Sequence, residues 1–262
     1  MNFSFRMNDF TKSVRFAGTR RLFGENGLTR LGTAHVAVIG IGGVGSWAVE
    51  TLARSGVGNL TLIDGDVVVE SNINRQIQAT DKTLGKPKVV ALAERIALIN
   101  PDCLVEPVRD FVRPENLDAL VGIKNVDFVI DAIDSVRDKT ALIAYCKEKA
   151  IPLITVGSAG GQMDPTRIDI CDLSRTQQEP LLAKVRKRLR SQYGFTRNPK
   201  NKFGIDAVYS LEPVKYPETA GIGETTDLPG LNPAGFGTTV AVTAGFGLAA
   251  ASYVLRRIAL LE

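Results

Sequence analysis

The stretch VAVIGIGGVG, residues 36–45, decides the fold of this 262-residue chain. Its first four residues are apolar and mostly β-branched, which predicts a buried strand. Gly40, Gly42 and Gly45 then match the GxGxxG pattern, in which the backbone turns tightly and brings the free N–H groups of a helix N-terminus close to a phosphate. A helix is predicted directly afterwards, over residues 46–55. A strand, a glycine turn and a helix in this order indicate a nucleotide-binding unit.

Predicted strands and helices alternate along the chain beyond this stretch. The strands cover residues 60–63, 104–108, 126–132 and 153–156, and the helices cover residues 88–100 and 138–150. Because parallel strands need crossover connections, the alternation predicts a doubly wound, Rossmann-like, mostly parallel α/β sheet. We therefore divide the chain into an N-terminal helical segment (1–34), a Rossmann-like domain (35–172) and a C-terminal extension (173–262) with a basic segment, a crossover loop and a helix.

The composition is that of a folded protein, with 44% hydrophobic and 23% charged residues and a formal charge of +4. Cys103, Cys146 and Cys171 are too far apart for a CxxC zinc pair, which favours a reducing, cytoplasmic location. A single histidine, His35, excludes a His-rich metal site. The apolar run 240–255 is short for a membrane span, so a core or interface helix is expected, with a membrane anchor as the alternative.

Charged residues gather where the predicted strands end. Asp64 and Asp66 close the second strand, where an acid can hold a ribose hydroxyl. Arg75 and Lys88 follow, and nucleotidyl transfer needs such cations because charge builds on the α-phosphate and on departing pyrophosphate. A solvated surface pair is the alternative. Asp131 and Asp134 lie at the end of a further strand, where one acid could hold magnesium or cap the next helix, a role that Ser135 could also fill.

Five motifs occur in an order typical of one family: GIGGVG, DGD at 64–66, SNINRQ at 71–76, GKPK at 85–88 and DAIDS at 131–135. On these motifs the chain resembles the ThiF/MoeB/HesA-type activating enzymes, relatives of ubiquitin-activating enzymes. The resemblance implies an adenylating enzyme that uses ATP and magnesium, with Arg75, Lys88 and Asp134 in catalysis and Asp134 as the metal ligand. It implies these nucleotide-binding residues: Gly40, Gly42, Gly43, Gly45, Asp64, Asp66, Asn72, Arg75, Gln76, Lys88 and Asp134.

The same family uses an arginine near its N-terminus that reaches across a homodimer. The usual position falls on Gly18 here, so the resemblance assigns the role to Arg21 or Arg15. Segments such as RFAGTRRLFG at 15–24 and GSAGGQMDPT at 157–166 resemble a tRNA-modifying branch of the family. That resemblance implies ATP-dependent dehydration of threonylcarbamoyladenosine beside the tRNA anticodon, through a carboxyl-adenylate, to the cyclic form. It also allows a sulfur-relay protein as a partner.

Two features of the C-terminal extension fit this chemistry. Residues 173–262 contain no cysteine, and ring closure within the substrate needs no enzyme nucleophile because the attacking nitrogen is already tethered. Residues 183–204 carry eight Lys or Arg and no acid, which favours phosphate contacts to tRNA over the alternative of a solvated helix face. The candidate tRNA-binding residues are Lys184, Arg186, Lys187, Arg190 and Lys200.

Three other functions stay open at this point. An activating enzyme for the C-terminus of a sulfur-carrier or ubiquitin-like protein would favour a cysteine in the crossover region. An NAD-dependent oxidoreductase would leave Arg75, Lys88 and Asp134 without a role, and tight NAD binding would support it. A non-catalytic RNA-binding module would bind no ATP.

Overall fold

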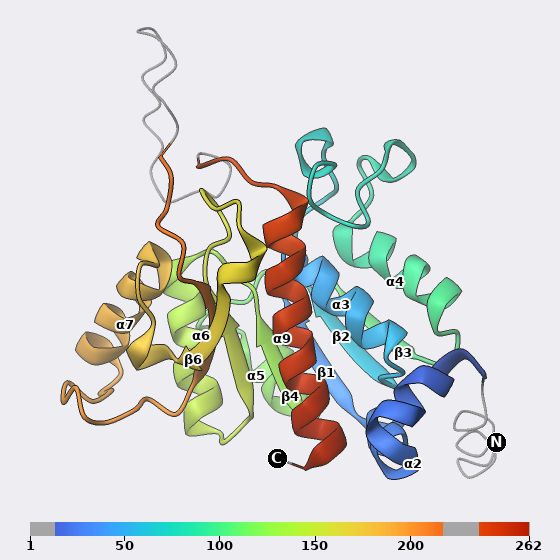
Figure 1. Ribbon diagram of the computed structural model, residues 1–262, viewed down its shortest axis with the longest axis horizontal. Coiled ribbons are helices and arrows are strands. Elements are labelled where there is room, and N and C mark those ends of the chain that lie inside the picture. Colours follow the sequence, from blue (N-terminus) through green and yellow to red (C-terminus); the bar gives the residue numbers. More distant parts are fainter. Residues whose placement is uncertain (1–13, 217–235, 262) are drawn as a thin grey trace, which may run out of the picture.

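The central sheet of the computed structural model, which describes residues 14–216 and 236–261, has seven strands in the order β3-β2-β1-β4-β5-β7-β6 (Figure 1). Neighbouring strands run parallel, except that β6 and β7 pair antiparallel. This arrangement confirms the predicted mostly parallel sheet. The strands are β1 (His35–Ile39), β2 (Asn59–Ile63), β3 (Leu104–Val108), β4 (Phe128–Asp131), β5 (Leu153–Val156), β6 (Ile168–Asp172) and β7 (Asp206–Ser210).

Helices cover both faces of the sheet (Figure 1). One face packs against α2 (Ala17–Thr33), α3 (Gly45–Arg54), α4 (Lys88–Ile99) and α9 (Val240–Leu260). The other packs against α5 (Leu117–Leu120), α6 (Val136–Glu148) and α7 (Pro180–Gln192). Short 3-10 helices are η1 (Val14–Phe16), η2 (Glu70–Asn72), η3 (Asp81–Thr83), η4 (Gly122–Lys124), η5 (Pro165–Arg167) and η6 (Leu173–Arg175).

The central strands are buried on both sides, as expected for parallel strands between two helical layers. Every residue of β4 and β5 is buried, and in β1 and β2 only the first residue is partly exposed. Helix α6 begins at Val136, two residues before the predicted start, because Ser135 is its N-cap. The strand predicted over residues 126–132 is shorter, at Phe128–Asp131. The local hydrophobic pattern therefore located each of these elements but not their ends.

The C-terminal extension is part of the same core. Strand β7, which the sequence pattern did not reveal, lies between β5 and β6. Helix α9 runs beside α3 (Figure 1), and its Phe246 and Val254 are fully buried. A Cβ at Gly247 would come within 2.4 Å of the Val44 carbonyl oxygen, so this glycine allows α9 to approach the turn after β1. Among the described helices, none is both long and apolar enough to cross a membrane. Most of the predicted crossover loop lies outside the described residues.

The strand order reverses between β1 and β4. The chain proceeds from β1 to β2 and β3 on one side, and β4 begins the other side. Their carboxyl ends are held together, since the Ala132 N–H donates to the Ile39 carbonyl oxygen at 2.8 Å. Open α/β sheets bind ligands at such a switch point, because the connections diverge there and leave a crevice. The glycine turn after β1 and the DAIDS motif after β4 meet at this crevice.

Candidate nucleotide-binding site

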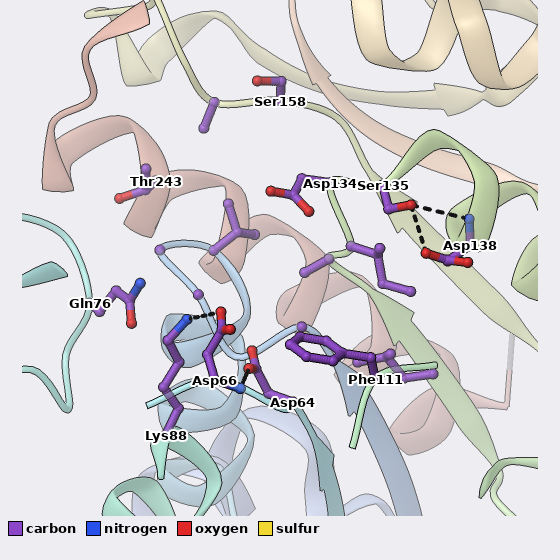
Figure 2. A pocket seen from close by; sticks show the side chains of 18 of the residues that line it. Asp64, Asp66, Gln76, Lys88, Phe111, Asp134, Ser135, Asp138, Ser158 and Thr243 are labelled. Atoms are coloured by element: carbon purple, nitrogen blue, oxygen red, sulfur yellow. Dashed lines mark hydrogen bonds and ion pairs between the residues drawn. The ribbon is translucent and has the colours of Figure 1, made fainter. Parts of the chain in front are cut away.

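A pocket of about 530 Å³ opens at the carboxyl ends of β1, β2 and β4. Figure 2 shows its acidic and basic side chains around the glycine turn. Nearly all of the predicted nucleotide-binding residues line this one pocket, although they come from five separate motifs. They are Gly40, Gly42, Gly43, Asp64, Asp66, Asn72, Arg75, Gln76, Lys88 and Asp134.

Gly45 is the exception, because it is not among the residues that line the pocket, and its contact with the nucleotide stays a prediction. It is the first residue of α3, and a Cβ there would lie 1.9 Å from the Gly40 carbonyl oxygen. Its role is to let α3 pack closely on the turn after β1. Gly40 has a φ of +86°, which disfavours any other residue, and a Cβ there would also strike the Ala132 carbonyl. Both glycines shape the pocket through packing of the backbone.

Asp64 fixes the turn that forms the floor of the pocket. Its Oδ2 accepts the Ile41 N–H at 2.6 Å, and its Oδ1 accepts the Asp66 N–H at 2.8 Å. The carboxylate therefore ties the glycine turn after β1 to the chain that follows β2. Ribose binding by Asp64 stays a prediction, and it would use the remaining acceptor capacity of these oxygens.

The cationic side of the pocket is formed by Lys88 and Arg75. Lys88 begins α4, is largely buried, and lies with its Nζ 2.7 Å from Oδ2 of Asp66. Arg75 donates to the Ser71 carbonyl oxygen at 2.6 Å, and Trp47 Nε1 donates to the Arg75 carbonyl oxygen at 2.9 Å. Burial lowers the pKa of Arg75, whose guanidinium remains charged at neutral pH. Lys88 and Arg75 are therefore not a solvated surface pair, which was the alternative interpretation of these two residues.

Asn72 and Gln76 are buried and oriented by hydrogen bonds. Asn72 Oδ1 accepts the Val69 N–H at 3.2 Å. Gln78, which sequence reasoning missed, donates from Nε2 to Gln76 Oε1 at 3.2 Å and to the Ile41 carbonyl oxygen at 3.0 Å. Buried amides that are fixed in this way point into the pocket without a large entropic cost on binding.

Asp134 is exposed at the pocket and makes no hydrogen bond or ion pair with the described residues. The cap of α6 is Ser135, whose Oγ accepts the Asp138 N–H at 3.4 Å and donates to Asp138 Oδ2 at 2.7 Å. The alternative role of Asp134 as a helix cap is therefore excluded. Within residues 14–216 and 236–261, no group of three His, Cys, Asp or Glu side chains could hold a metal ion alone.

Phe111 forms an aromatic wall that sequence reasoning missed. The side chain is 46% exposed, and its ring packs over Gly65, where a Cβ would come within 2.5 Å of it. The Arg113 guanidinium carbon lies 5.7 Å from the ring centroid. Phe111 follows β3 at the same edge of the sheet as the other pocket residues. This position after a strand is the one feature of the sequence that could have predicted it as a pocket residue. Its ring offers a surface on which a planar base can stack.

Arg21, the predicted cross-dimer arginine, does not line the pocket of its own chain. It is exposed on α2, which packs against the far end of α9, where Arg30 donates to the Ala259 carbonyl oxygen at 3.0 Å. Arg15 is also distant from the pocket and donates to the Ile99 carbonyl oxygen at the end of α4 at 2.5 Å. Any contact of Arg21 with a nucleotide pocket would therefore require a second copy of the chain.

The structure divides the predicted tRNA-binding residues into two groups. Lys184, Lys187 and Lys200 are exposed. Arg186 is partly buried and donates to Thr176 Oγ1. Arg190 donates to the Thr196 carbonyl oxygen at 3.3 Å, and its guanidinium carbon lies 5.1 Å from the centroid of the Phe203 ring. The two arginines thus anchor α7 and the loop after it, which the charge pattern alone did not indicate.

A doubly wound sheet with a glycine turn, acids and cations at its switch point defines a Rossmann-like nucleotide-binding protein. The chain belongs to the ThiF family, which its sequence matches over residues 17–259. A tRNA threonylcarbamoyladenosine dehydratase from Haemophilus influenzae is 51% identical over 245 residues, 93% of each chain. The enzyme with that name from Escherichia coli is 49% identical over 249 residues, 93% of this chain and 92% of the other.

Solved structures agree with these similarities. The crystal structure of E. coli tRNA N6-threonylcarbamoyladenosine dehydratase in complex with ATP matches with a TM-score of 0.86 at 48% identity and covers 94% of each chain. The complex of that enzyme with AMP matches with a TM-score of 0.85 at 48% identity, over 94% of this chain and 95% of the other. The E. coli enzyme thus binds the two nucleotides expected at the beginning and the end of an adenylation reaction.

Proposed function

We propose that this protein is an ATP-dependent tRNA threonylcarbamoyladenosine dehydratase, which closes threonylcarbamoyladenosine to its cyclic form through a carboxyl-adenylate. The observation that carries the proposal is the meeting of Asp134, Lys88 and Arg75 in one pocket beside the glycine turn. An unpaired carboxylate that shares a pocket with a buried lysine and a partly buried arginine suits a triphosphate with its metal, and it has no function in hydride transfer. The similarity to enzymes of this name over nearly the whole chain supports the choice of substrate.

The first step activates the threonyl carboxylate. A carboxylate oxygen forms a bond to the α-phosphorus of ATP, the bond from that phosphorus to the bridging oxygen breaks, and pyrophosphate leaves. Lys88 and Arg75 supply fixed positive charge to the phosphates as negative charge moves onto the leaving group. The glycine turn lets the phosphates approach the backbone N–H groups at the start of α3.

In the second step, a nitrogen of the same modification attacks the activated carbonyl carbon. The hydantoin ring closes, the bond to AMP breaks, and the nitrogen loses its proton. The net reaction converts ATP to AMP and pyrophosphate and removes the elements of water from the modification. No cysteine is needed, in agreement with the burial that raises the pKa of the thiols of Cys103 and Cys146 to about 12.

Magnesium fits this pocket as a phosphate-bound ion. It commonly uses one or two carboxylates together with substrate phosphates, and Asp134 offers one carboxylate that no described side chain occupies. When bound, the ion would neutralise phosphate charge. We assign Asp134 as its protein ligand and assign the surrounding charge stabilisation to Lys88 and Arg75.

The tRNA would lie over α7, with Lys184, Lys187 and Lys200 as its phosphate contacts. These side chains are exposed and come from an element whose Leu181 lines the nucleotide pocket, or from the loop that follows it. The enzyme would act as a homodimer in which Arg21 of one copy reaches the pocket of the other. A sulfur-relay protein stays a further candidate partner.

Nucleoside mass spectrometry tests the proposal. The protein and ATP are incubated with tRNA that carries threonylcarbamoyladenosine and, as a control, with unmodified tRNA. The tRNA is then digested under mild conditions that spare the hydantoin. We expect the modified nucleoside to become lighter by the mass of one water, with formation of AMP that requires the modified tRNA. Turnover of ATP with a ubiquitin-like protein and none with tRNA would instead support the sulfur-carrier alternative.

A further inference from the structure

A second groove lies beside the nucleotide pocket, at the N-terminal end of α7. It has a volume of about 390 Å³ and is lined by Pro180, Ala183 and Arg186 from α7 and by Pro213 and Tyr216 from the segment after β7. Leu181, between the first two of these residues, lines the nucleotide pocket instead. A single turn of α7 thus separates the two spaces.

The α7 wall of the groove is attached to the nucleotide pocket by Glu179. This side chain is 2% exposed, and its Oε1 accepts the Ser158 N–H at 2.8 Å, while its Oε2 accepts the Leu182 N–H. Ser158 lines the nucleotide pocket (Figure 2). A Cβ at Gly157 would approach the Glu179 side chain to 2.9 Å, so the glycine is needed for this contact.

The opposite wall is attached to the same loop. The Lys215 N–H donates to the Gly161 carbonyl oxygen at 2.8 Å, and Glu212 Oε2 accepts the N–H groups of Met163 and Asp164 at 2.9 and 2.8 Å. Both walls therefore have fixed positions relative to the loop over residues 157–164, whose first part lines the nucleotide pocket. The groove is a built feature, and the fold sets its position relative to the nucleotide pocket.

The lining has the chemistry of a nucleobase site. Tyr216 is 70% exposed and meets the Phe236 ring edge to face, with the ring centroids 5.4 Å apart, and Pro180 and Pro213 add apolar surface. Arg186 contributes a partly buried guanidinium, and α7 carries the exposed cations Lys184 and Lys187 beyond it. Proteins recognise single-stranded RNA loops by stacking unpaired bases on aromatic rings and arginine planes beside a basic surface. Glu179 also lines the groove, and its carboxylate oxygens accept the N–H groups of Ser158 and Leu182.

We infer that this groove takes the base of a nucleotide that flanks the modified adenosine in the anticodon loop, with Tyr216 as its stacking partner. The inference rests on the proposed function, because it places the modified nucleotide in the neighbouring pocket. Unstacking one neighbour would turn the modified adenosine toward the loop at Ser158, and the groove would hold the neighbour away. The groove is thus a specificity subsite for loop sequence or shape.

The test couples a change in the protein to a change in the RNA. The substrates are an anticodon stem-loop that carries threonylcarbamoyladenosine and versions of it with one flanking nucleotide made abasic. We expect one abasic position to lower kcat/KM for AMP formation by wild-type protein about tenfold to one-hundredfold, the effect of losing one base–aromatic stack. Tyr216→Ala should lower kcat/KM on the intact RNA by a similar factor. With the Tyr216→Ala protein, the abasic RNA should then give the same kcat/KM as the intact RNA.

Three variants control for general damage. Tyr216→Phe keeps the ring and should keep the sensitivity to the abasic change. Tyr193→Ala removes an exposed tyrosine at the far end of α7 and should behave like wild type. Ala183→Phe fills the groove while Tyr216 stays in place, so it should reproduce the effect of Tyr216→Ala even if that variant folds poorly.

The groove assignment would be overturned if the abasic change lowered kcat/KM by the same factor in Tyr216→Ala as in wild type. The same holds if no abasic position lowers the activity of the wild-type protein. Formation of AMP by wild type on the intact RNA shows that the proposed function stands in either case. Absence of AMP with that RNA would instead refute the proposed function, and the groove assignment with it.

Discussion

Lys139 Nζ lies 2.9 Å from Oδ2 of Asp131, and both side chains are fully buried beneath the nucleotide pocket. Thr155 Oγ1 also donates to this carboxylate oxygen at 2.7 Å, and the Ile133 N–H donates to Oδ1 at 3.1 Å. The pair joins α6 to the end of β4, where the chain turns toward Asp134. It therefore holds the backbone that presents the proposed magnesium ligand.

Removing one member of this pair should destabilise the fold. Lys139→Met leaves a buried carboxylate without its counter-charge, and such changes cost about 3–5 kcal/mol. The matched control is Lys86→Met, which breaks the exposed pair of Lys86 with Glu94 and should cost about 1 kcal/mol or less. Urea unfolding followed by circular dichroism measures both. Equal destabilisation of the two variants would show that the buried pair contributes no more to the free energy of unfolding than the surface pair.

Adenylation should depend on the three charged residues at the pocket. Arg75→Ala, Lys88→Ala and Asp134→Ala should each slow tRNA-dependent AMP formation by on the order of a hundredfold, as expected when one fixed charge is removed from the site. Lys86→Ala, two residues from Lys88 but paired with Glu94 at the surface, is the control and should keep nearly full activity. Normal turnover of Asp134→Ala would remove the proposed metal ligand from the mechanism.

Mixing two inactive variants tests whether Arg21 works across a dimer. Arg21→Ala and Lys88→Ala should each be inactive alone. In a mixed dimer, the Arg21→Ala copy keeps its own Lys88 and receives Arg21 from its partner, so one complete site forms. We expect activity to return when the two proteins are unfolded together and refolded. If the mixture stays as inactive as its components, Arg21 does not act in trans.

The cysteines should be dispensable. Burial raises the pKa of Cys103 and Cys146 to about 12 and also raises the pKa of Cys171, so all three thiols stay protonated at pH 8. Iodoacetamide at that pH should leave AMP formation unchanged, and the triple replacement by Ala or Ser should be active in any folded form. Rapid inactivation that ATP and tRNA prevent would point to a thiol nucleophile.

Binding of tRNA should weaken with salt, because cations that bind phosphates release condensed counterions. Changing Lys184, Lys187 and Lys200 to Gln should lower the slope of log affinity against log salt by roughly 0.7–0.9 for each lysine that binds a phosphate, with ATP affinity unchanged. Arg186 and Arg190 are left in place because their hydrogen bonds anchor α7.

The control for this experiment removes the same charge elsewhere. Lys82, Lys147 and Lys149 are exposed and lie outside α7, and their change to Gln should not alter the slope. Identical slopes for wild type and the α7 variant would mean that these lysines only face water and that tRNA binds on another surface.

Much of the site was predictable because its residues come directly after the carboxyl ends of strands. A parallel sheet brings the carboxyl ends of its strands to one edge, so Asp64, Asp66 and Asp134 had to meet once the strands were recognised. Arg75 and Lys88 needed more than this rule, and the family resemblance placed them. Phe111 was missed because a single aromatic residue after a strand carries no pattern. The assignment of Gly45 to the nucleotide stays a prediction, while the structure adds that this glycine packs closely against the Gly40 carbonyl.

The sequence by itself determined the class of fold, the location of the nucleotide pocket and most of its polar residues, because hydrophobic periodicity and glycine turns act over a few neighbouring residues. Only the tertiary structure decided which cations face solvent and which are anchored, as Lys184 and Arg186 illustrate. It also decided that Lys139 is fully buried against Asp131 and that Tyr216 lies across a groove from α7. These relations join segments far apart in the chain, and no local pattern encodes how such segments pack.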